Sequence, residues 1–576
     1  MAKFLLLITL LISVVYTDLK AQSYPTEYFM APLKGTLQLS GSFAELRRNH
    51  FHSGIDIRTG GKEGLPVYAC AEGYVVRIKI EPGGFGKAVY INHPNGFTTV
   101  YAHLQKFNAA IDNWIRARQY EKESFAVDLF PPKGLLKVSK GEIIAISGNS
   151  GSSEGPHLHF EIRDTKTEMP IDPVLFGIQV KDFIRPTLHG LRIYPEGMNS
   201  TINDKATPVT LSLAGWGPVY RLKIFDTIYI AGRFSLGVSA SDLMNETSNR
   251  NGVTEYAVFI DSLRVFEWKA QKFSFAETRY INSFIDYPNY YNSNVKFMRT
   301  HTDPGNKLNM YIYNPSKGDF TAVPGMLHHI KITIKDSHLN ESVLRFYVKG
   351  VKPQSKVSDK TTGGIKTEGL LFTVNQTNNF ATPDMRISLP GNCLYDSIRF
   401  IYGKSPSLSN SYSSIHSIHT PMVPLHQYYD LNIRVKSDVK VDTTKLVVVR
   451  LNNANKPSSV GGKFENGFMK VKLRDFGKYT VMADTIPPII RAQNFKEGMD
   501  VSTTNEIRIT ITDNLSGIST YRGEINGKWI LLDYDAKNRM LTYRKDAIME
   551  KGVNLLTLTV GDGVGNMAIS QWNLRN

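Results

Sequence analysis

The stretch GPHLHFEIR, residues 155–163, carries the alternation that decides the fold of the first part of the chain. Leu158, Phe160 and Ile162 fall on one face of an extended chain, and the two histidines fall on the other. Apolar side chains at every second position are typical of a β-strand that covers a hydrophobic core. The opposite face of this strand is therefore expected to present two imidazoles.

The same alternation recurs upstream, between residues 35 and 178. Glycine-containing turns such as EPGGFG and HPNG separate the alternating segments, which is the pattern of antiparallel strands joined by hairpins. We therefore predict an all-β domain of antiparallel strands. The segments are YVVRIKI (74–80), AVYINH (88–93), TTVYAHL (98–104) and EIIAISG (142–148).

One segment, FNAAIDNWIRARQYEKESFAVDL (107–129), breaks the alternation. Ile111, Trp114, Ile115 and Arg118 recur at the spacing of one helix face, and Pro131 and Pro132 follow. We predict a helical insertion over residues 107–132, between two strands of the sheet.

The remainder of the chain, from Arg185 onward, is strand-like and rich in Asn, Ser, Thr and Tyr. An alternating strand followed by Asp and a turn with Asn or Gly recurs four times, which is typical of the edges of immunoglobulin-like sandwiches. The four copies are VSASDLMNETS (238–248), ITIKDSHLNESVLRF (332–346), ITDNLSGIS (511–519) and LTVGDGVGNMAIS (558–570).

These segments predict three β-rich domains after the first domain, which spans residues 22–180. We expect a β-sandwich domain at 185–350, a β-rich domain at 367–484 and an Ig-like domain at 485–576. The stretch KPQSKVSDKTTGGIK (352–366) has few hydrophobic residues and is interpreted as a linker.

The N-terminus has the order of a secretory signal peptide: Met-Ala-Lys, the apolar run FLLLITLLISVVY (4–16) and a small residue at Ala21. We predict that residues 1–21 are removed. The apolar run is shorter than the roughly 20 residues that cross a bilayer, so we expect no membrane anchor after cleavage. The mature protein is expected in the periplasm or outside the cell.

The number of cysteines and the net charge argue against several classes of protein and of metal site. Cys70 and Cys393 are the only cysteines and lie in different predicted domains, so neither a disulfide framework nor a cysteine zinc site is expected. The net charge of +16 fits either an anionic envelope polymer or a generally solvated basic surface. Export and the lack of any nucleic-acid-binding motif argue against nucleic acid.

Six of the fourteen histidines lie between His50 and His159. In HSGID (52–56), His52 and Asp56 are four residues apart on an extended chain and share a face, so both can reach one ion. His157 and His159 are two residues apart and also share a face, so this pair can supply a further ligand. Three nitrogen and oxygen ligands with an open fourth position are the pattern of catalytic zinc.

A further histidine, His103, lies on one face of TTVYAHL with Thr99 and Tyr101. The sequence has no HExxH motif, so no helix glutamate is available as the general base of a metalloprotease. Histidine would then have to act as the general acid and general base.

These segments resemble, in order, the lysostaphin or LytM type of zinc metallopeptidases that cleave peptidoglycan, over residues 36–178. The resemblance implies an antiparallel β-sheet peptidase domain with one zinc ion held by His52, Asp56 and His159, and catalysis by His103 and His157. The substrate would be amide bonds in the peptide stems or cross-links of peptidoglycan. The matching segments are HSGID, LPVYACAEGYVVRI (65–78), GFGKAVYINHPNGFTTVYAHL (84–104), KGEIIAISGNSG (140–151) and GPHLHFEIR.

Several positions keep two interpretations. His50 could replace His52 or lie at the rim of the site, and Glu161 could orient His159 or be an exposed strand residue. His93, in the turn HPNG, is interpreted as structural. The helical insertion could cover the substrate groove or pack against the next domain.

Two other functions remain open. The first domain could be a non-catalytic envelope-binding or activator module, although relatives of that kind lack ligands that this chain retains. Alternatively, the chain could be an adhesin or scaffold whose main role lies in the β-rich tail, which could bind other envelope proteins.

Overall fold

The computed structural model describes residues 24–215, 217–224, 227–353, 369–437 and 440–576. The predicted signal peptide, residues 1–21, lies outside the described residues, and so does all of the predicted linker beyond residue 353. Within the described ranges, no helix combines the length and the apolar character that a membrane crossing needs.

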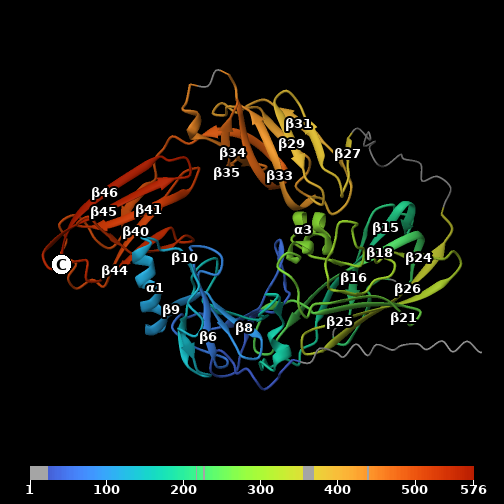
Figure 1. The fold of residues 1–576 in the computed structure, drawn as a ribbon. Coiled ribbons are helices and arrows are strands. Elements are labelled where there is room, and N and C mark those ends of the chain that lie inside the picture. The colour runs from blue at the N-terminus through green and yellow to red at the C-terminus, as the bar shows by residue number, and fades with distance from the viewer. Residues whose placement is uncertain (1–23, 216, 225–226, 354–368, 438–439) are drawn as a thin grey trace, which may run out of the picture.

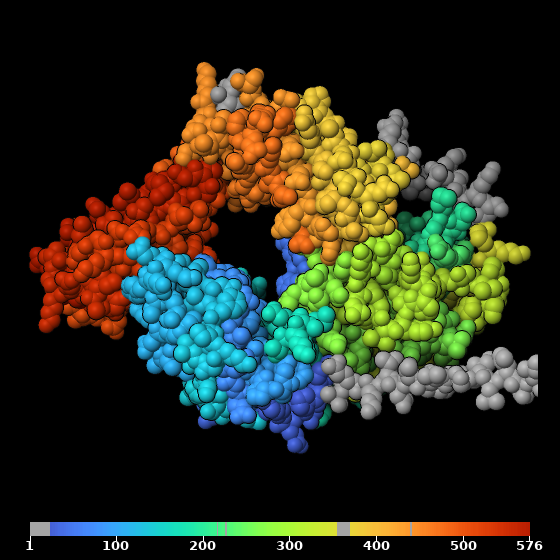
Figure 2. Space-filling model, in the orientation of Figure 1, coloured from blue at the N-terminus to red at the C-terminus, as the bar shows by residue number. Residues whose placement is uncertain are grey.

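The chain forms four β-rich units arranged in a ring (Figure 1). They comprise residues 24–180, 187–351, 370–483 and 489–575, and each has its own hydrophobic core. The fourth unit returns to lie beside the first, and the space-filling view shows an opening at the centre of the ring (Figure 2). The predicted domain boundaries stay predictions.

The first unit is built on a nine-stranded antiparallel sheet whose main path runs β1-β4-β13-β8-β7-β6-β10. The two strands that carry the HSGID and HLH segments are therefore neighbours, and the strand before His103 lies on the other side of β13. The strands are β1 (Leu39–Gly41), β4 (Ile55–Arg58), β6 (Gly73–Ile80), β7 (Lys87–Asn92), β8 (Phe97–Ala102), β10 (Val127–Leu129), β11 (Lys137–Val138), β13 (His157–Asp164) and β14 (Pro170–Ile171).

A smaller sheet and a two-stranded ribbon complete the first unit. Strand β13 lies in the middle of the large sheet, and both of its faces are covered. His159 is therefore buried, as Leu158 and Phe160 are. The smaller sheet contains β5 (Pro66–Tyr68), β12 (Ile143–Ser147) and β9 (Leu104–Phe107), and the ribbon contains β2 (Leu46–Arg47) and β3 (His50–Phe51). The unit ends with the 3-10 helix η1 (Pro173–Phe176).

The predicted insertion contains the helix α1 (Ala109–Glu121), shorter than the predicted range of 107–132. Asn108 caps its start by accepting a hydrogen bond from the Ile111 N–H, and β10 follows its end. Ile111 and Ile115 are buried in the core of the first unit. The prediction of a β-rich chain with a helical insertion is thus confirmed.

The second unit contains a twelve-stranded sheet and three short helices. Phe43 and Phe51 of the first unit pack into its core, so these two units share an apolar interface. Its elements are β15 (Thr187–Ile202), β16 (Val209–Ala214), β17 (Val219–Leu222), β18 (Thr227–Leu243), β19 (Arg250–Asn251), β20 (Glu255–Ile260), β21 (Leu263–Lys269), η2 (Thr278–Tyr280), α2 (Ile281–Phe284), α3 (Tyr287–Ser293), β22 (Met298–Arg299), β23 (Tyr311–Tyr313), β24 (Phe320–Ala322), β25 (Leu327–Lys335) and β26 (Glu341–Val351).

The third unit has two five-stranded antiparallel sheets and a two-stranded one. It contacts the second unit through His426, which stacks on Tyr280 at a ring distance of 4.2 Å. Its elements are β27 (Leu370–Phe372), β28 (Asn378–Ala381), β29 (Met385–Leu389), β30 (Ile398–Phe400), β31 (Tyr402–Ser405), β32 (Ile415–Ile418), β33 (Pro424–Arg434), η3 (Thr443–Lys445), β34 (Leu446–Leu451), β35 (Pro457–Gly461), β36 (Lys463–Glu465), β37 (Phe468–Asp475) and β38 (Gly477–Ala483).

The fourth unit packs two four-stranded sheets around one core. One sheet has the order β39-β40-β44-β43 and the other β42-β41-β45-β46. The strands are β39 (Ile489–Ala492), β40 (Glu506–Thr512), β41 (Ile518–Ile525), β42 (Lys528–Ile530), β43 (Leu532–Asp535), β44 (Met540–Arg544), β45 (Val553–Asp562) and β46 (Met567–Arg575).

Contacts between the fourth unit and the first close the ring. Tyr120, near the end of α1, bonds Asp546 and packs edge-on against Trp529 at a ring distance of 5.1 Å. Lys87 forms an ion pair with Asp533 at 2.5 Å. The helix thus contacts a distant β-rich unit as well as its own core, and its role as a lid stays a prediction.

Candidate metal centre

Strand pairing brings the HSGID and HLH segments together. In the antiparallel pair of β4 and β13, Asp56 lies opposite His159 and Arg58 lies opposite His157. His52 lies in the short turn between β3 and β4, four residues before Asp56. Residues 103 positions apart therefore meet at one point of the sheet because two strands pair in this register.

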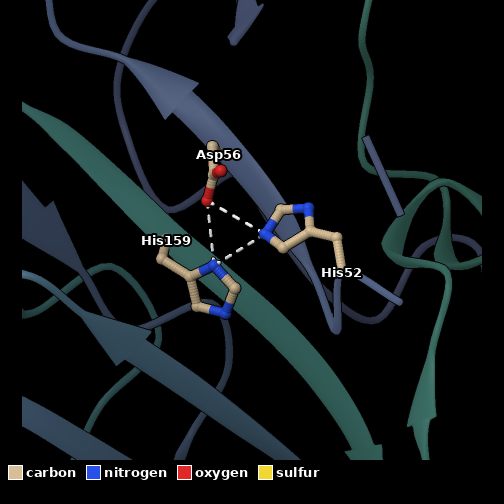
Figure 3. Close-up of side chains that lie close together, drawn as sticks. All are labelled: His52, Asp56 and His159. Carbon is tan, nitrogen blue, oxygen red and sulfur yellow. Dashed lines mark hydrogen bonds and ion pairs between the residues drawn. The ribbon is translucent and has the colours of Figure 1, made fainter. Parts of the chain in front are cut away.

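The side chains of His52, Asp56 and His159 point toward one another (Figure 3). His52 Nε2 lies 3.0 Å from His159 Nδ1 and 3.1 Å from Asp56 Oδ1, and His159 Nδ1 lies 2.9 Å from Asp56 Oδ1. All three side chains are buried. Three nitrogen and oxygen atoms that lie this close together could hold one metal ion.

Hydrogen bonds behind the three groups fix which ring nitrogen faces the centre. His52 Nδ1 contacts the Ser42 carbonyl at 2.8 Å, so its Nε2 is turned inward. His159 Nε2 contacts Glu161 Oε1 at 2.8 Å, so its Nδ1 is turned inward. Outer partners of this kind orient metal-binding histidines and raise their basicity.

Glu161 is fully buried, which excludes the interpretation as an exposed strand residue. Its Oε1 also accepts a hydrogen bond from Ser53 Oγ at 2.5 Å, and its Oε2 pairs with Arg163 Nε at 2.5 Å. The structure thus favours the other interpretation, in which Glu161 orients His159.

Arg47 is a contact that sequence reasoning missed. Its Nη2 lies 2.5 Å from Asp56 Oδ2, the carboxylate oxygen that faces away from the two imidazoles. Arg47 belongs to β2, outside the matching segments, so no motif pointed to it. Its ion pair holds the Asp56 carboxylate so that only Oδ1 faces the histidines.

The electrostatics of the centre follow from burial and pairing. Burial lowers the pKa of His52 to about 4, so its ring is neutral at pH 7. Burial also acts to lower the pKa of His159, but its hydrogen bonds with Asp56 and Glu161 raise the value to about 9. Burial would raise the pKa of Asp56, yet the charge of His52 and bonds from the three neighbouring imidazoles hold it well below its usual value.

His103 and His157 flank the centre, with ring centroids 4.8 Å apart. His157 Nε2 lies 3.4 Å from Asp56 Oδ1, while its Nδ1 contacts the Gly155 carbonyl at 2.8 Å. His103 Nδ1 contacts the Ser150 carbonyl at 2.9 Å. A ring whose Nδ1–H donates to a carbonyl keeps Nε2 as the nitrogen that can accept a proton.

His103 sits where β8 ends and β9 begins, with a positive φ of 58°. Such a conformation is uncommon outside glycine and is found at functional positions. Burial, together with the charges of His159 and His157, lowers the pKa of His103 to about 3. Its ring is therefore neutral at pH 7.

The glycine loop GNSGSSEGP (148–156) borders this centre. A Cβ on Gly151 would lie 2.3 Å from the backbone nitrogen of Gly86, so the missing side chain lets two loops pack together. Lys537 of the fourth unit bonds the carbonyls of Asn149 and Ser153, the latter at 3.1 Å. A residue nearly 400 positions away thus reaches the rim, and no local signal in the sequence could predict this contact.

The two remaining histidines of this region lie outside the cluster. His50 is exposed and contacts the Arg48 carbonyl at 2.9 Å, which favours the rim interpretation over replacement of His52. His93 is buried between the Glu72 carbonyl at 2.7 Å and Thr99 Oγ1 at 2.8 Å, as a structural residue would be.

Comparison with known proteins assigns part of the first unit to a protein family. Residues 50–120 and 135–173 match peptidase family M23, and residues 370–484 match the Zu5-like domain. The DD-carboxypeptidase/endopeptidase Mpg of Neisseria meningitidis is 35% identical over 28% of this chain and 27% of its own length. The peptidoglycan DD-endopeptidase ShyA of Vibrio cholerae is 30% identical over 26% of this chain and 30% of its own length.

One solved structure is similar to part of this chain. The catalytic domain of lysostaphin from Staphylococcus simulans is 24% identical, covers 23% of this chain and 87% of that chain, and has a TM-score of 0.18. The chain covers less than a third of the length of Mpg and ShyA, so the similarity concerns only part of each protein. The first unit of the chain is a domain of peptidase family M23, the lysostaphin and LytM type.

Proposed function

We propose that this protein is a zinc-dependent endopeptidase that hydrolyses amide bonds in the peptide stems or cross-links of bacterial peptidoglycan. One observation carries the proposal: the ligating atoms of His52, Asp56 and His159 converge within 3.1 Å, beside two further imidazoles. The names of Mpg and ShyA, each an endopeptidase, point to the same chemistry.

In this proposal His52 Nε2, His159 Nδ1 and Asp56 Oδ1 hold one zinc ion. When bound, zinc supplies Lewis acidity toward a scissile amide carbonyl and toward an attacking water. Glu161 fixes the His159 ring by hydrogen bonding its Nε2. Arg47 holds the second oxygen of Asp56, so the carboxylate offers the ion one oxygen rather than two.

His103 and His157 carry the proton transfers. Each has its Nδ1 on a backbone carbonyl, so Nε2 takes a proton from the attacking water and later gives one to the leaving amine. His157 Nε2 lies 3.4 Å from the inward oxygen of Asp56, within reach of a water at the open position. Protonated Nε2 groups also stabilise the negative charge on the carbonyl oxygen.

We infer that the protein acts in the cell envelope, because the N-terminal residues have the pattern of a secretory signal and the substrate lies there. Peptidoglycan is the main partner. The Zu5-like unit and the two other β-rich units are proposed to position the peptidase or to bind other envelope proteins.

Digestion of purified peptidoglycan by the zinc-loaded protein, with fragments identified by mass spectrometry, tests the proposal. We expect peptide-bond cleavage products that are absent with His159→Ala. Full zinc occupancy with no cleavage of intact wall or short muropeptides would overturn the enzyme and leave the binding or activator function.

A further inference from the structure

Two groups of three aspartates occupy matching places in the second and fourth units. Asp182 lies four residues before Pro186, just ahead of β15, and Asp484 lies four residues before Pro488, just ahead of β39. The other members end or follow strands in the recurring strand-Asp-turn segments. They are Asp242 and Asp336 in the second unit and Asp513 and Asp562 in the fourth.

Both groups are held by the same hydrogen bonds. Asn340 Nδ2 donates to Asp336 Oδ2 at 2.9 Å and to the Asp182 carbonyl at 3.4 Å. Asn566, four residues after its own aspartate, makes the two equivalent bonds at 2.6 and 2.9 Å. The two groups are therefore versions of one structural motif, placed where each unit begins.

In the fourth unit, Asp484 and Asp513 each accept backbone hydrogen bonds, although Asp513 Oδ1 has no partner among the described residues and ligand atoms of the three aspartates lie within 4.8 Å of one another. Asp484 Oδ2 accepts a bond from the Ser516 N–H at 2.8 Å. Asp513 Oδ2 accepts bonds from Leu515 and Gly517 at 2.9 and 2.8 Å. A carboxylate that accepts several such bonds is stable in its charged form without any other ligand.

In the second unit, Asp182 accepts a backbone hydrogen bond from Ile184, and Asp336 accepts two, from His338 and Asn340. Asp242 is the member of this group that accepts none from the described residues. Asp242 is 0% exposed, and neither of its carboxylate oxygens accepts a hydrogen bond in the described part of the chain. Among the described residues, Asp182 Oδ2 is likewise without a hydrogen bond and lies 3.5 Å from His338 Nδ1. Buried carboxylates of this kind are normally paired or bound to a metal.

The side chain of Asp242 is directed at the other two aspartates. Burial raises its pKa to about 9, the negative charges of Asp182 and Asp336 add to the rise, and the Leu243 backbone N–H acts in the opposite direction. Ligand atoms of Asp182, Asp336 and His338 lie within 4.8 Å of one another. Three carboxyl groups thus lie beside one imidazole, and without a cation Asp242 keeps a proton at pH 7.

We propose that Asp182, Asp242 and Asp336 form a calcium site. Calcium takes six to eight oxygen ligands in flexible geometry, which three carboxylates, nearby backbone carbonyls and water can supply. Oxygen-rich sites of this kind suit calcium and magnesium, whereas zinc prefers nitrogen and sulfur. His338 then serves as a neighbour of Asp182 rather than the feature that selects the metal.

The location gives the ion a role. The site lies where the first unit ends and the second begins, and Ser337 Oγ beside it donates to Asp172 Oδ2 of the first unit at 2.7 Å. Phe183, in the connecting segment, donates its N–H to Asn245 Oδ1 at 2.8 Å. A bound calcium would therefore brace the peptidase unit against its neighbour in the ring.

Calcium titration of the full chain, stripped of metal and reloaded with zinc, tests the proposal by calorimetry and by thermal unfolding. We expect one site with a Kd on the order of 10⁻⁴–10⁻³ M or tighter, the range of extracellular calcium modules, and a rise in Tm on binding. Asp242→Asn should weaken this binding more than tenfold and remove the calcium-dependent rise in Tm.

Asp513→Asn, the matching change in the fourth unit, is the control and should leave the calcium response unchanged. Peptidase activity with zinc should be the same in both variants and in the parent. No binding up to about 10 mM calcium, equal binding by Asp242→Asn, or tighter binding of zinc than of calcium at this site would overturn the proposal. If Tm falls with rising pH and does not change with calcium, the carboxyl groups share a proton instead of binding a cation.

Discussion

The cluster at His52 and the cluster at Asp182 both gather acidic and imidazole groups in a buried space, but they balance charge differently. At His52, two imidazoles face one carboxylate, and Ser42, Glu161 and Arg47 hold the outer atoms of the three groups. At Asp182, three carboxylates face one imidazole, and Asp242 has no hydrogen-bond donor in the described residues.

This difference in ligand type and charge indicates which metal each cluster can bind. Nitrogen ligands with fixed orientation and an open side suit zinc in a catalytic role. Oxygen ligands with excess negative charge suit a hard cation in a structural role. The two clusters should therefore respond independently to mutation.

The largest effect is expected from His159→Ala. It should weaken zinc binding by well over 100-fold, since even outer partners of a metal ligand contribute about 10–100-fold, and peptidoglycan cleavage should be lost. Elemental analysis and wall digestion measure both effects. Calcium binding should stay as in the parent, and its loss would show that the two clusters are not independent.

His103→Ala and His157→Ala should lower kcat by about 100-fold to 10,000-fold while zinc content stays near one per chain, because these residues act on protons and not on the ion. Single-turnover digestion at saturating zinc measures the change. Loss of zinc in either variant would make that residue a ligand and move it into the first cluster.

Glu161→Gln should weaken zinc binding by about 10–100-fold, since the amide is a poorer partner for His159 Nε2 than the carboxylate. Competition with a zinc chelator gives the affinity. Excess zinc should restore most of the activity, and a deficit that excess zinc does not relieve would assign Glu161 a role in the reaction itself.

Zinc binding should weaken on acidification by up to about tenfold per pH unit below pH 9. The zinc-free site holds a proton on His159, whose pKa is raised to about 9, and the ion must displace that proton. Calorimetry in two buffers of different ionisation enthalpy should detect a released proton. The same dependence of zinc affinity on pH is expected in Asp242→Asn. A different dependence would show that the two clusters influence each other.

Much of the first unit could be predicted because its signals are local. Alternation in GPHLHFEIR and TTVYAHL predicted strands, and the helical spacing around Trp114 predicted α1, since both periods arise within a few residues. The motifs also predicted which residues meet at the proposed zinc site. The helix proved shorter than expected because Asn108 caps its start and a strand follows its end.

Other features depend on contacts between distant segments. Arg47 reaches Asp56 from outside every motif, and the Ser42 carbonyl that turns His52 Nε2 inward also lies outside the motifs. The contact between α1 and the fourth unit depends on the closing of the ring.

The sequence by itself determined the strand pattern, the helical insertion and the set of imidazoles and carboxylate that can bind a metal, because alternation and motif spacing are properties of neighbouring residues. The sequence also contains the four strand-Asp-turn segments, but it does not show how the hydrogen bonding of their aspartates differs. Only the tertiary structure decided that the Asp242 carboxylate is fully buried and accepts no hydrogen bond from the described residues, because the surroundings of a buried carboxylate are set by how whole strands and loops pack around it.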